Sequence, residues 1–380
     1  MKTTFISVLL LSSLLAISFA GCKKDEEDKK KDPNHLGWVY DPTPYTGPTV
    51  PRNFPQPTYV ANNNPLTEEG VLLGRMLFYD PILSGDSSLA CAGCHKQENA
   101  FTDTRTFSIG IDGIAGRRQS MPLFNMMYGS KFFWDGRAAN LAELALMPVE
   151  DPIEMHETWP NNIAKLQAHP DYPKRFYEAF GVEPEDLTKE YAAKALEQFL
   201  LSLVSGNSKF DKAVRGTDEL TAAEERGFIL FNDQLGADCF HCHGDGSANQ
   251  VFQEINAIRQ FRNNGLDAPA TPQGFADYGL GEFTGNINDY GKFKVPSLRN
   301  LKFTAPYMHD GRFATLEEVV EHYSTGVKAA SPNIDAGGME YAYQGGVQLT
   351  AQEKADLIAF LLTLSDDEFV TDPRFSNPFE

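Results

Sequence analysis

Apolar residues recur at helical spacing in four segments, and the four segments form two matching pairs. Each segment opens with Leu-Thr, which is typical of a helix start because a threonine hydroxyl can cap the first turn. In two segments an acidic residue follows three positions later, as Thr221 with Glu224 and Thr350 with Glu353 show, and this predicts capping boxes. Strand patterns are scarce. The sequence therefore predicts a mainly α-helical protein with an internal repeat. The four segments are 66–80, 187–203, 220–233 and 349–364.

The first residues form an apolar run from Phe5 to Ala20 that ends at Gly21 and Cys22. This pattern predicts a lipoprotein signal peptide over residues 1–21, with Cys22 as the lipidated residue, and not a membrane span. Residues 22–64 are charged and then rich in Pro and Asn, so they predict a solvated tether that buries no core. The charged run beside the lipid also resembles a surface-export signal. We therefore expect an exported, lipid-anchored protein on the periplasmic face of a membrane or on the outer-membrane surface of a diderm bacterium.

The chain carries a formal net charge of −19. Nucleic-acid binding needs basic surface, so this balance argues against a nucleic-acid partner. It favours partners with basic faces, such as small electron-carrying cytochromes.

Cysteine usage decides the chemistry. Apart from Cys22, every cysteine lies in one of two C-x-x-C-H motifs, at 91–95 and 239–243. This spacing is the attachment signature of haem c, in which two thioethers hold the porphyrin and the adjacent histidine ligates the iron. A zinc site of four thiolates would leave both histidines unexplained, and disulfides across two residues would be strained. The predicted haem-binding residues are Cys91, Cys94 and His95 for the first haem and Cys239, Cys242 and His243 for the second.

A further repeated phrase, Asp-Gly-Arg, follows each haem motif, at 135–137 and 310–312. The chain is therefore predicted to hold two tandem cytochrome c-like domains with long loops, each with one covalent haem c. We expect the N-terminal domain at 65–205 and the C-terminal domain at 206–380.

The two halves differ where a sixth iron ligand would lie. Thirteen residues after the Asp of each Asp-Gly-Arg phrase stand Pro148 in the first half and Tyr323 in the second. Proline cannot ligate iron, whereas tyrosinate is a known haem ligand. His322 is the rival of Tyr323. The sequence therefore predicts an open first haem and a closed second haem.

Together with the haem motifs, three phrases resemble the bacterial dihaem cytochrome c peroxidase family, including its MauG branch, over about residues 60–365. The resemblance implies a peroxidatic first haem, an electron-transfer second haem, Trp134 between them and Glu154 as the acid–base carboxylate. It also implies hydrogen peroxide as substrate and a small cytochrome c or cupredoxin as electron donor. The three phrases are 133–138, 295–300 and 305–311.

Three positions depart from the family pattern. Ile111 stands where many members carry a removable distal histidine, so the oxidised first haem is expected to be open without prior reduction. Leu144 replaces a glutamine of the distal pocket. Gln119 replaces an asparagine that supports an inter-haem calcium ion, for which the carbonyls of Thr304 and Pro306 remain candidate ligands.

Other functions stay open at this point. A MauG-like oxidase of a protein or organic substrate is supported by Tyr323, and a non-catalytic dihaem electron carrier is the other class. Glu154 and an open first iron argue against the carrier. His156 is a second candidate for the peroxide pocket, and a homodimer is compatible with the sequence.

Overall fold

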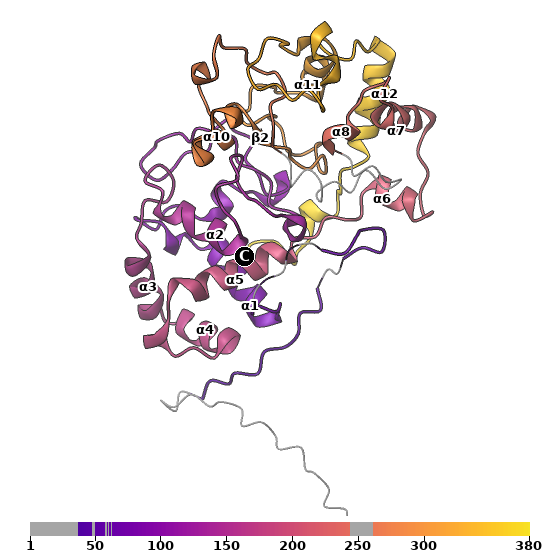
Figure 1. Cartoon of the computed structure of the whole chain (residues 1–380). Coiled ribbons are helices and arrows are strands. Elements are labelled where there is room, and N and C mark those ends of the chain that lie inside the picture. The colour runs from indigo at the N-terminus through magenta and orange to yellow at the C-terminus, as the bar shows by residue number, and fades with distance from the viewer. Residues whose placement is uncertain (1–36, 48–49, 58, 60, 62, 244–260) are drawn as a thin grey trace, which may run out of the picture.

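The computed structural model describes residues 37–47, 50–57, 59, 61, 63–243 and 261–380 (Figure 1). The predicted signal peptide and Cys22 lie outside these residues. The described part is mainly helical, and its one sheet pairs β1 (Phe261–Arg262) with β2 (Phe293–Lys294) in antiparallel order. Within the same part, no helix is long and apolar enough to cross a membrane.

The four predicted helices are present, and they are joined by shorter ones. Both predicted capping boxes form: the Thr221 hydroxyl accepts from the Glu224 N–H, and the Thr350 hydroxyl accepts from the Glu353 N–H. The first half contains α1 (Glu68–Tyr79), α2 (Leu141–Glu150), α3 (Trp159–Ala168), α4 (Tyr172–Phe180) and α5 (Lys189–Ser202). The second half contains α6 (Lys209–Val214), α7 (Ala222–Asn232), α8 (Phe240–His243), α10 (Leu280–Thr284), α11 (Leu316–Glu321) and α12 (Ala351–Leu362).

The two halves repeat the same helix crossing. Helix α1 packs against α5 at Gly74, where an added Cβ would lie 1.9 Å from the Ala195 carbonyl oxygen. Helix α7 packs against α12 at Gly227, where an added Cβ would lie 2.0 Å from the Asp356 carbonyl oxygen. Each pair therefore needs a glycine for close backbone approach.

Loop conformations repeat as well. Asn125 and Asn300 are both left-handed, with φ of 53° and 62°. Phe133 and Met308 are also left-handed, with φ of 63° and 73°. Each lies two residues before the Asp of its Asp-Gly-Arg phrase. Each half has its own hydrophobic core. The domain boundary at 205/206 remains our interpretation of this repeat.

The predicted tether is wrong for its described residues. From residue 37 the chain runs along the first half, and Phe54 is buried against Tyr128 with the Arg299 guanidinium 4.5 Å from its ring centre. Thr43 and Thr46 bond to carboxylates at the start of α1. A Pro-rich composition predicted solvation, but widely spaced aromatic side chains find apolar partners on the folded surface.

The C-terminal tail also departs from the expected division. Phe369 and Phe375 are buried in the core of the first half, not the second. The Tyr79 hydroxyl donates to the Phe375 carbonyl at 2.8 Å, and Arg75 bonds to Ser376. Figure 1 shows the C-terminus beside α5. The two halves are thus held together by a crossing of the chain as well as by their shared surface.

Two candidate haem sites

The first hollow is bounded on one side by Cys91, Cys94 and His95. Both cysteines are free thiols. His95 lies with its Nδ1 2.9 Å from the Phe101 carbonyl, so Nδ1 donates and Nε2 is left to bind a metal. Burial lowers the pKa of His95, which keeps the imidazole neutral, as a metal ligand must be.

The remaining wall of this hollow carries no histidine in the described chain. Leu144 and Pro148 of α2 line it, so the proline predicted to leave the iron open does lie in the first hollow. Three methionines, Met121, Met126 and Met155, also line this hollow. A backbone hydrogen bond at Met121 raises the pKa of His95 and so opposes the effect of burial. The side chains of Met126 and Met155 pack in the hydrophobic core of the first half.

Glu154 lines the same hollow from the turn that follows α2. Burial, with a contribution from the Asp151 charge, raises its pKa to about 7, and Arg137 opposes the shift. A carboxyl with this pKa can both accept and return a proton near neutral pH.

The loop that carries Ile111 is packed tightly on the Glu154 turn. The Ile111 N–H donates to the Glu154 carbonyl at 3.0 Å, and a Cβ at Gly110 would lie 2.1 Å from the Ile153 carbonyl oxygen. The Ile111 side chain does not line the hollow. His156 does not line it either, because its Nδ1 lies 2.6 Å from Asp112 on the exposed side; that part of the prediction is wrong.

The second hollow is bounded by Cys239, Cys242 and His243 at α8. Both cysteines are free thiols here too. Burial lowers the pKa of His243 to about 4, against an opposing effect of the Pro296 carbonyl. This imidazole is therefore neutral as well.

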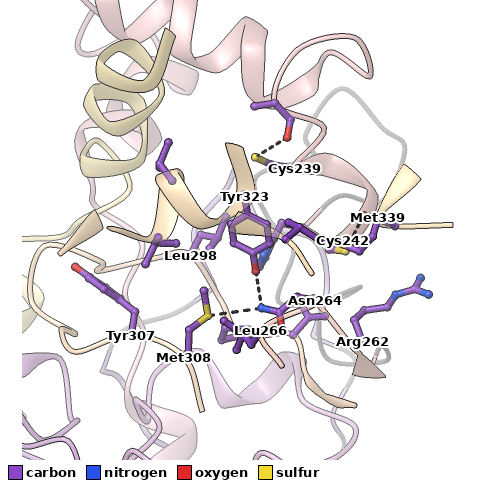
Figure 2. Close-up of a pocket in the computed structure, with 18 of the residues that line it drawn as sticks. Cys239, Cys242, Arg262, Asn264, Leu266, Leu298, Tyr307, Met308, Tyr323 and Met339 are labelled. Carbon is purple, nitrogen blue, oxygen red and sulfur yellow. Dashed lines mark hydrogen bonds between the residues drawn. The ribbon is translucent and has the colours of Figure 1, made fainter. Parts of the chain in front are cut away.

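Tyr323, in the π-helical turn His322–Gly326 after α11, lines the second hollow. Its hydroxyl accepts from the Asn264 amide at 3.0 Å, and the same amide lies 3.7 Å from the Met308 sulfur (Figure 2). Burial raises the pKa of Tyr323, and the Asn264 hydrogen bond opposes the shift. Tyr323 and the cysteine pair therefore line the same hollow, with the phenol hydroxyl directed at Asn264.

His322 faces elsewhere. Its Nε2 donates to the Asn264 carbonyl at 3.1 Å, and the ring lines a separate surface hollow with Arg312 and Lys328. Met308 was not singled out in the sequence. The repeat could have revealed it, because Met308 occupies in the second half the place that Phe133 has in the first.

A shared wall separates the two hollows and is formed by Gln119, Pro122, Trp134 and Lys294. The Trp134 indole N–H donates to the Gln119 carbonyl at 2.8 Å, and Trp134 is 8% exposed. The sequence prediction placed Trp134 between two haems, and the side chain does lie between the two hollows.

Calcium binding remains a prediction. Thr304 and Pro306 line the second hollow with Gln119, but the Gln119 amide nitrogen is engaged by Thr102 and Asp103. In the described residues no cluster of three or more His, Cys, Asp or Glu side chains could hold a metal ion.

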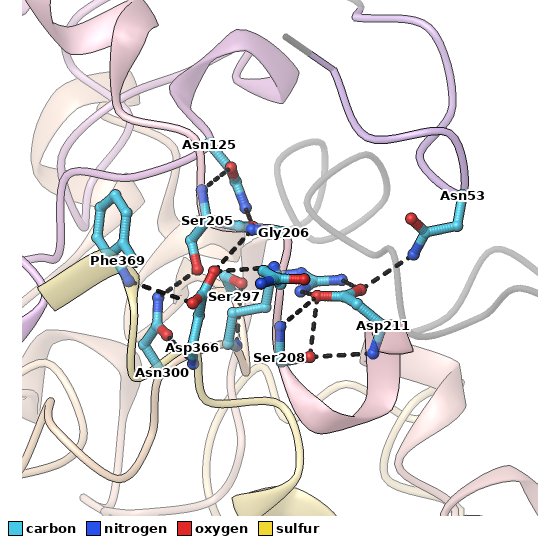
Figure 3. Close-up of polar contacts among 12 residues, drawn as sticks. Asn53, Asn125, Ser205, Gly206, Ser208, Asp211, Ser297, Asn300, Asp366 and Phe369 are labelled. Atoms are coloured by element: carbon cyan, nitrogen blue, oxygen red, sulfur yellow. Dashed lines mark hydrogen bonds and ion pairs between the residues drawn. The ribbon is translucent and has the colours of Figure 1, made fainter. Parts of the chain in front are cut away.

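The segment that joins the halves is fixed by hydrogen bonds from both sides (Figure 3). Asn125 exchanges two bonds with Ser205, at 2.9 and 3.0 Å, and Asn300 donates to the Ser205 hydroxyl at 3.0 Å. Asp366 accepts from the N–H groups of Gly206 and Asn207. The two asparagines are the left-handed pair of the repeat, so equivalent residues of each half meet at one junction.

A buried ion pair lies beside this junction. Arg299 binds Asp211 through two bonds of 2.8 and 3.0 Å, and their side chains are 1% and 0% exposed. Asn53 donates to the same carboxylate at 3.1 Å, so the N-terminal segment is also tied to the second half.

Known proteins of one family are similar to this chain over most of its length. A family model described as di-haem cytochrome c peroxidase matches residues 68–219. The methylamine utilization protein MauG of Methylorubrum extorquens is 35% identical over 320 residues, which cover 83% of this chain and 82% of that protein. The cytochrome c551 peroxidase of Nitrosomonas europaea is 33% identical over 312 residues, which cover 80% and 81%.

Two solved structures are similar in fold. A MauG-like protein associated with microbial copper homeostasis is 38% identical, with a TM-score of 0.76, and the match covers 87% of this chain and 99% of that one. The diheme peroxidase BthA from Burkholderia thailandensis is 24% identical with a TM-score of 0.67, over 83% and 90%, and supports the fold alone.

Proposed function

Because the chain belongs to the di-haem cytochrome c peroxidase family, we propose that it reduces hydrogen peroxide to water with electrons from a small cytochrome c or cupredoxin. The family is one of haem oxidoreductases, and its name implies two haems.

The residues present fit two haem c groups. Each hollow has a pair of cysteines outside any disulfide next to a half-buried histidine whose pKa is lowered, which is the donor set that covalent attachment and axial ligation require. Cys91, Cys94 and His95 would hold the first group, and Cys239, Cys242 and His243 the second. When bound, the haems supply one-electron redox chemistry and, at the first site, an iron that can bind peroxide.

The observation that carries the proposal is the position of Glu154. Its carboxyl lines the first hollow with a pKa of about 7, so it can take a proton from peroxide and return it to the leaving oxygen. Pro148 stands in that hollow, whereas Tyr323 faces the second. We infer that the first site admits peroxide and that Tyr323 closes the second site to it.

Trp134 and the second site would carry electrons to the first. The indole lies between the hollows and is held by the Gln119 carbonyl, so its orientation is fixed. An aromatic ring in this place offers a path for electrons from the second haem.

A MauG-like oxidation of a protein or organic substrate is the second candidate. The specific observation that favours it is Tyr323, which lines the second hollow with the cysteine pair, whereas the neighbouring His322 lines a separate surface hollow. A simple electron carrier is disfavoured, because it has no use for a carboxyl poised as Glu154 is.

Export, lipid attachment at Cys22, a place on the periplasmic or outer-membrane surface, and assembly as a homodimer belong to the same proposal. Export, lipid attachment and the place at the membrane rest on the sequence pattern of residues 1–22.

Steady-state peroxide consumption with several reduced donors tests the reaction. We expect turnover with a small cytochrome c or cupredoxin, and Glu154→Gln should lose it while both haem spectra stay unchanged. Absence of turnover with every donor, together with peroxide-dependent oxidation of an organic or protein substrate, would favour the second candidate.

A further inference from the structure

Among the residues that the structure describes, Lys294 is the one ionisable side chain in the wall that both hollows share. It belongs to β2, and its backbone N–H donates to the Trp134 carbonyl at 2.8 Å. Figure 1 shows β2 where the two halves meet. The residue is only 9% exposed and lines both hollows, so its side chain lies at the wall between the two candidate haem sites and is largely shielded from bulk water.

The charge of this lysine is not balanced by the described residues. Burial alone lowers the pKa of Lys294 to about 8, and no described carboxylate acts on it. The contact found for its Nζ among these residues is the Phe132 ring, at 5.8 Å from the ring centre. Since burying an ammonium without an anion is strongly unfavourable, an anionic partner is expected from whatever fills the hollows.

The neighbouring polar groups do not supply that partner. The Gln119 backbone carbonyl accepts from the Trp134 indole N–H, and the Gln119 side-chain amide donates to the Thr102 hydroxyl and the Asp103 backbone carbonyl, so neither group is an anion. Pro122 has no side-chain polar atom. The unmatched group in the described part of the shared wall is therefore the cation of Lys294, a residue that lines both hollows.

Haem has the complementary chemistry. The porphyrin is apolar except for two propionate carboxylates, and these lie on the edge opposite the vinyl groups that cysteine thiols attack. A haem held by its cysteines therefore directs its carboxylates away from them. We propose that the Lys294 ammonium binds a haem propionate at the wall between the two hollows and serves as a cationic anchor for cofactors in both halves.

The anchor should also act on the redox equilibrium. Reduction of a haem adds one negative charge, so a nearby ammonium favours the reduced form. A unit charge at about 12 Å in a medium of effective dielectric constant about 20 changes the ratio of reduced to oxidised haem by about tenfold. For a one-electron couple, a tenfold change corresponds to about 59 mV.

The test is a redox titration of the purified dihaem protein, with resonance Raman spectra of the propionate bending modes. Lys294→Met should lower the reduced-to-oxidised ratio of at least one haem by about tenfold at fixed potential and should shift the propionate modes. Lys294→Arg should keep both near wild type. Lys292→Met is the matched control, because Lys292 lies two residues away and lines neither hollow.

If Lys294→Met fails to assemble with haem, Lys294→Gln removes the charge and keeps a hydrogen-bond donor, and the same lowered ratio is expected. Reduced-to-oxidised ratios within twofold of wild type for both haems in the neutral variant, with unshifted propionate modes, would overturn the proposal. The inference rests on haem binding and not on peroxide turnover. Because neither measurement contains peroxide, its failure is distinguishable from failure of the peroxidase assignment.

Discussion

Replacement of Glu154 by glutamine is the sharpest test of the catalytic geometry. The side chain keeps its shape but can no longer accept a proton. Loss of a well-placed general base typically costs about 10²–10⁴-fold in rate, so kcat/KM for peroxide should fall by that factor. The absorption spectra of both haems should be unchanged, because Glu154 lies on the wall of the hollow and not in a haem attachment motif.

The pKa of Glu154 gives this prediction a pH signature. With a pKa of about 7, roughly half of the carboxyl is ionised at pH 7 and about a tenth at pH 6. Since the ionised form is the base, wild-type kcat/KM should rise about tenfold per pH unit up to about pH 7 and then level off. In the Glu154→Gln variant, kcat/KM should not show this rise with pH, which is the rising limb of the pH profile.

Asp151→Asn is the matched variant. The Asp151 charge helps to raise the pKa of Glu154, so its removal should lower that pKa and move the rising limb to lower pH, with the plateau rate retained. Stopped-flow mixing with peroxide across pH 5–9 measures both quantities. A Glu154→Gln enzyme that keeps the wild-type rate, or keeps the wild-type limb, would refute the assignment of the base.

Three further predictions follow from the two sites. Two haems per chain should survive acid-acetone extraction, and one haem per chain would contradict the repeat. Tyr323→Phe should change the spectrum of the second haem, whereas His322→Ala should not. The Met308 sulfur lies beside the same Asn264 amide as the Tyr323 hydroxyl. A sulfur-to-iron band in the near infrared and a raised potential in Tyr323→Phe would therefore show that Met308 has replaced the phenol as ligand. Oxidised protein mixed with one equivalent of peroxide should react without a lag, because Ile111 offers no ligand to expel; a lag abolished by prior reduction would show that the first haem is closed at rest, with Met155 as the candidate ligand.

Local signals made much of the molecule predictable from its sequence. The capping boxes at Thr221 and Thr350 depend on residues three positions apart, and they form as expected. The equivalence of Pro148 and Tyr323 could be predicted from the internal sequence repeat alone. Each of these side chains lines the hollow of its own half.

What the sequence did not predict depends on contacts between distant segments. Phe54 looked like part of a tether, because its partners Tyr128 and Arg299 come from other parts of the chain. Phe375 looked like part of the second half, although its partners lie in the first. Lys294 carried no local signal, since burial between two hollows is a property of the folded chain.

The hydrogen bonds that fix Ser205 to both halves have a consequence for electron transfer between the two sites. A connection bonded by an asparagine of each half, with the C-terminal tail crossing back over the first core, restricts hinge motion between the halves as far as the structure describes them. The distance between the two sites on either side of Trp134 should then stay nearly constant in the folded protein. Electron tunnelling between the two centres should accordingly proceed at a rate independent of solvent viscosity, with driving force as its remaining control.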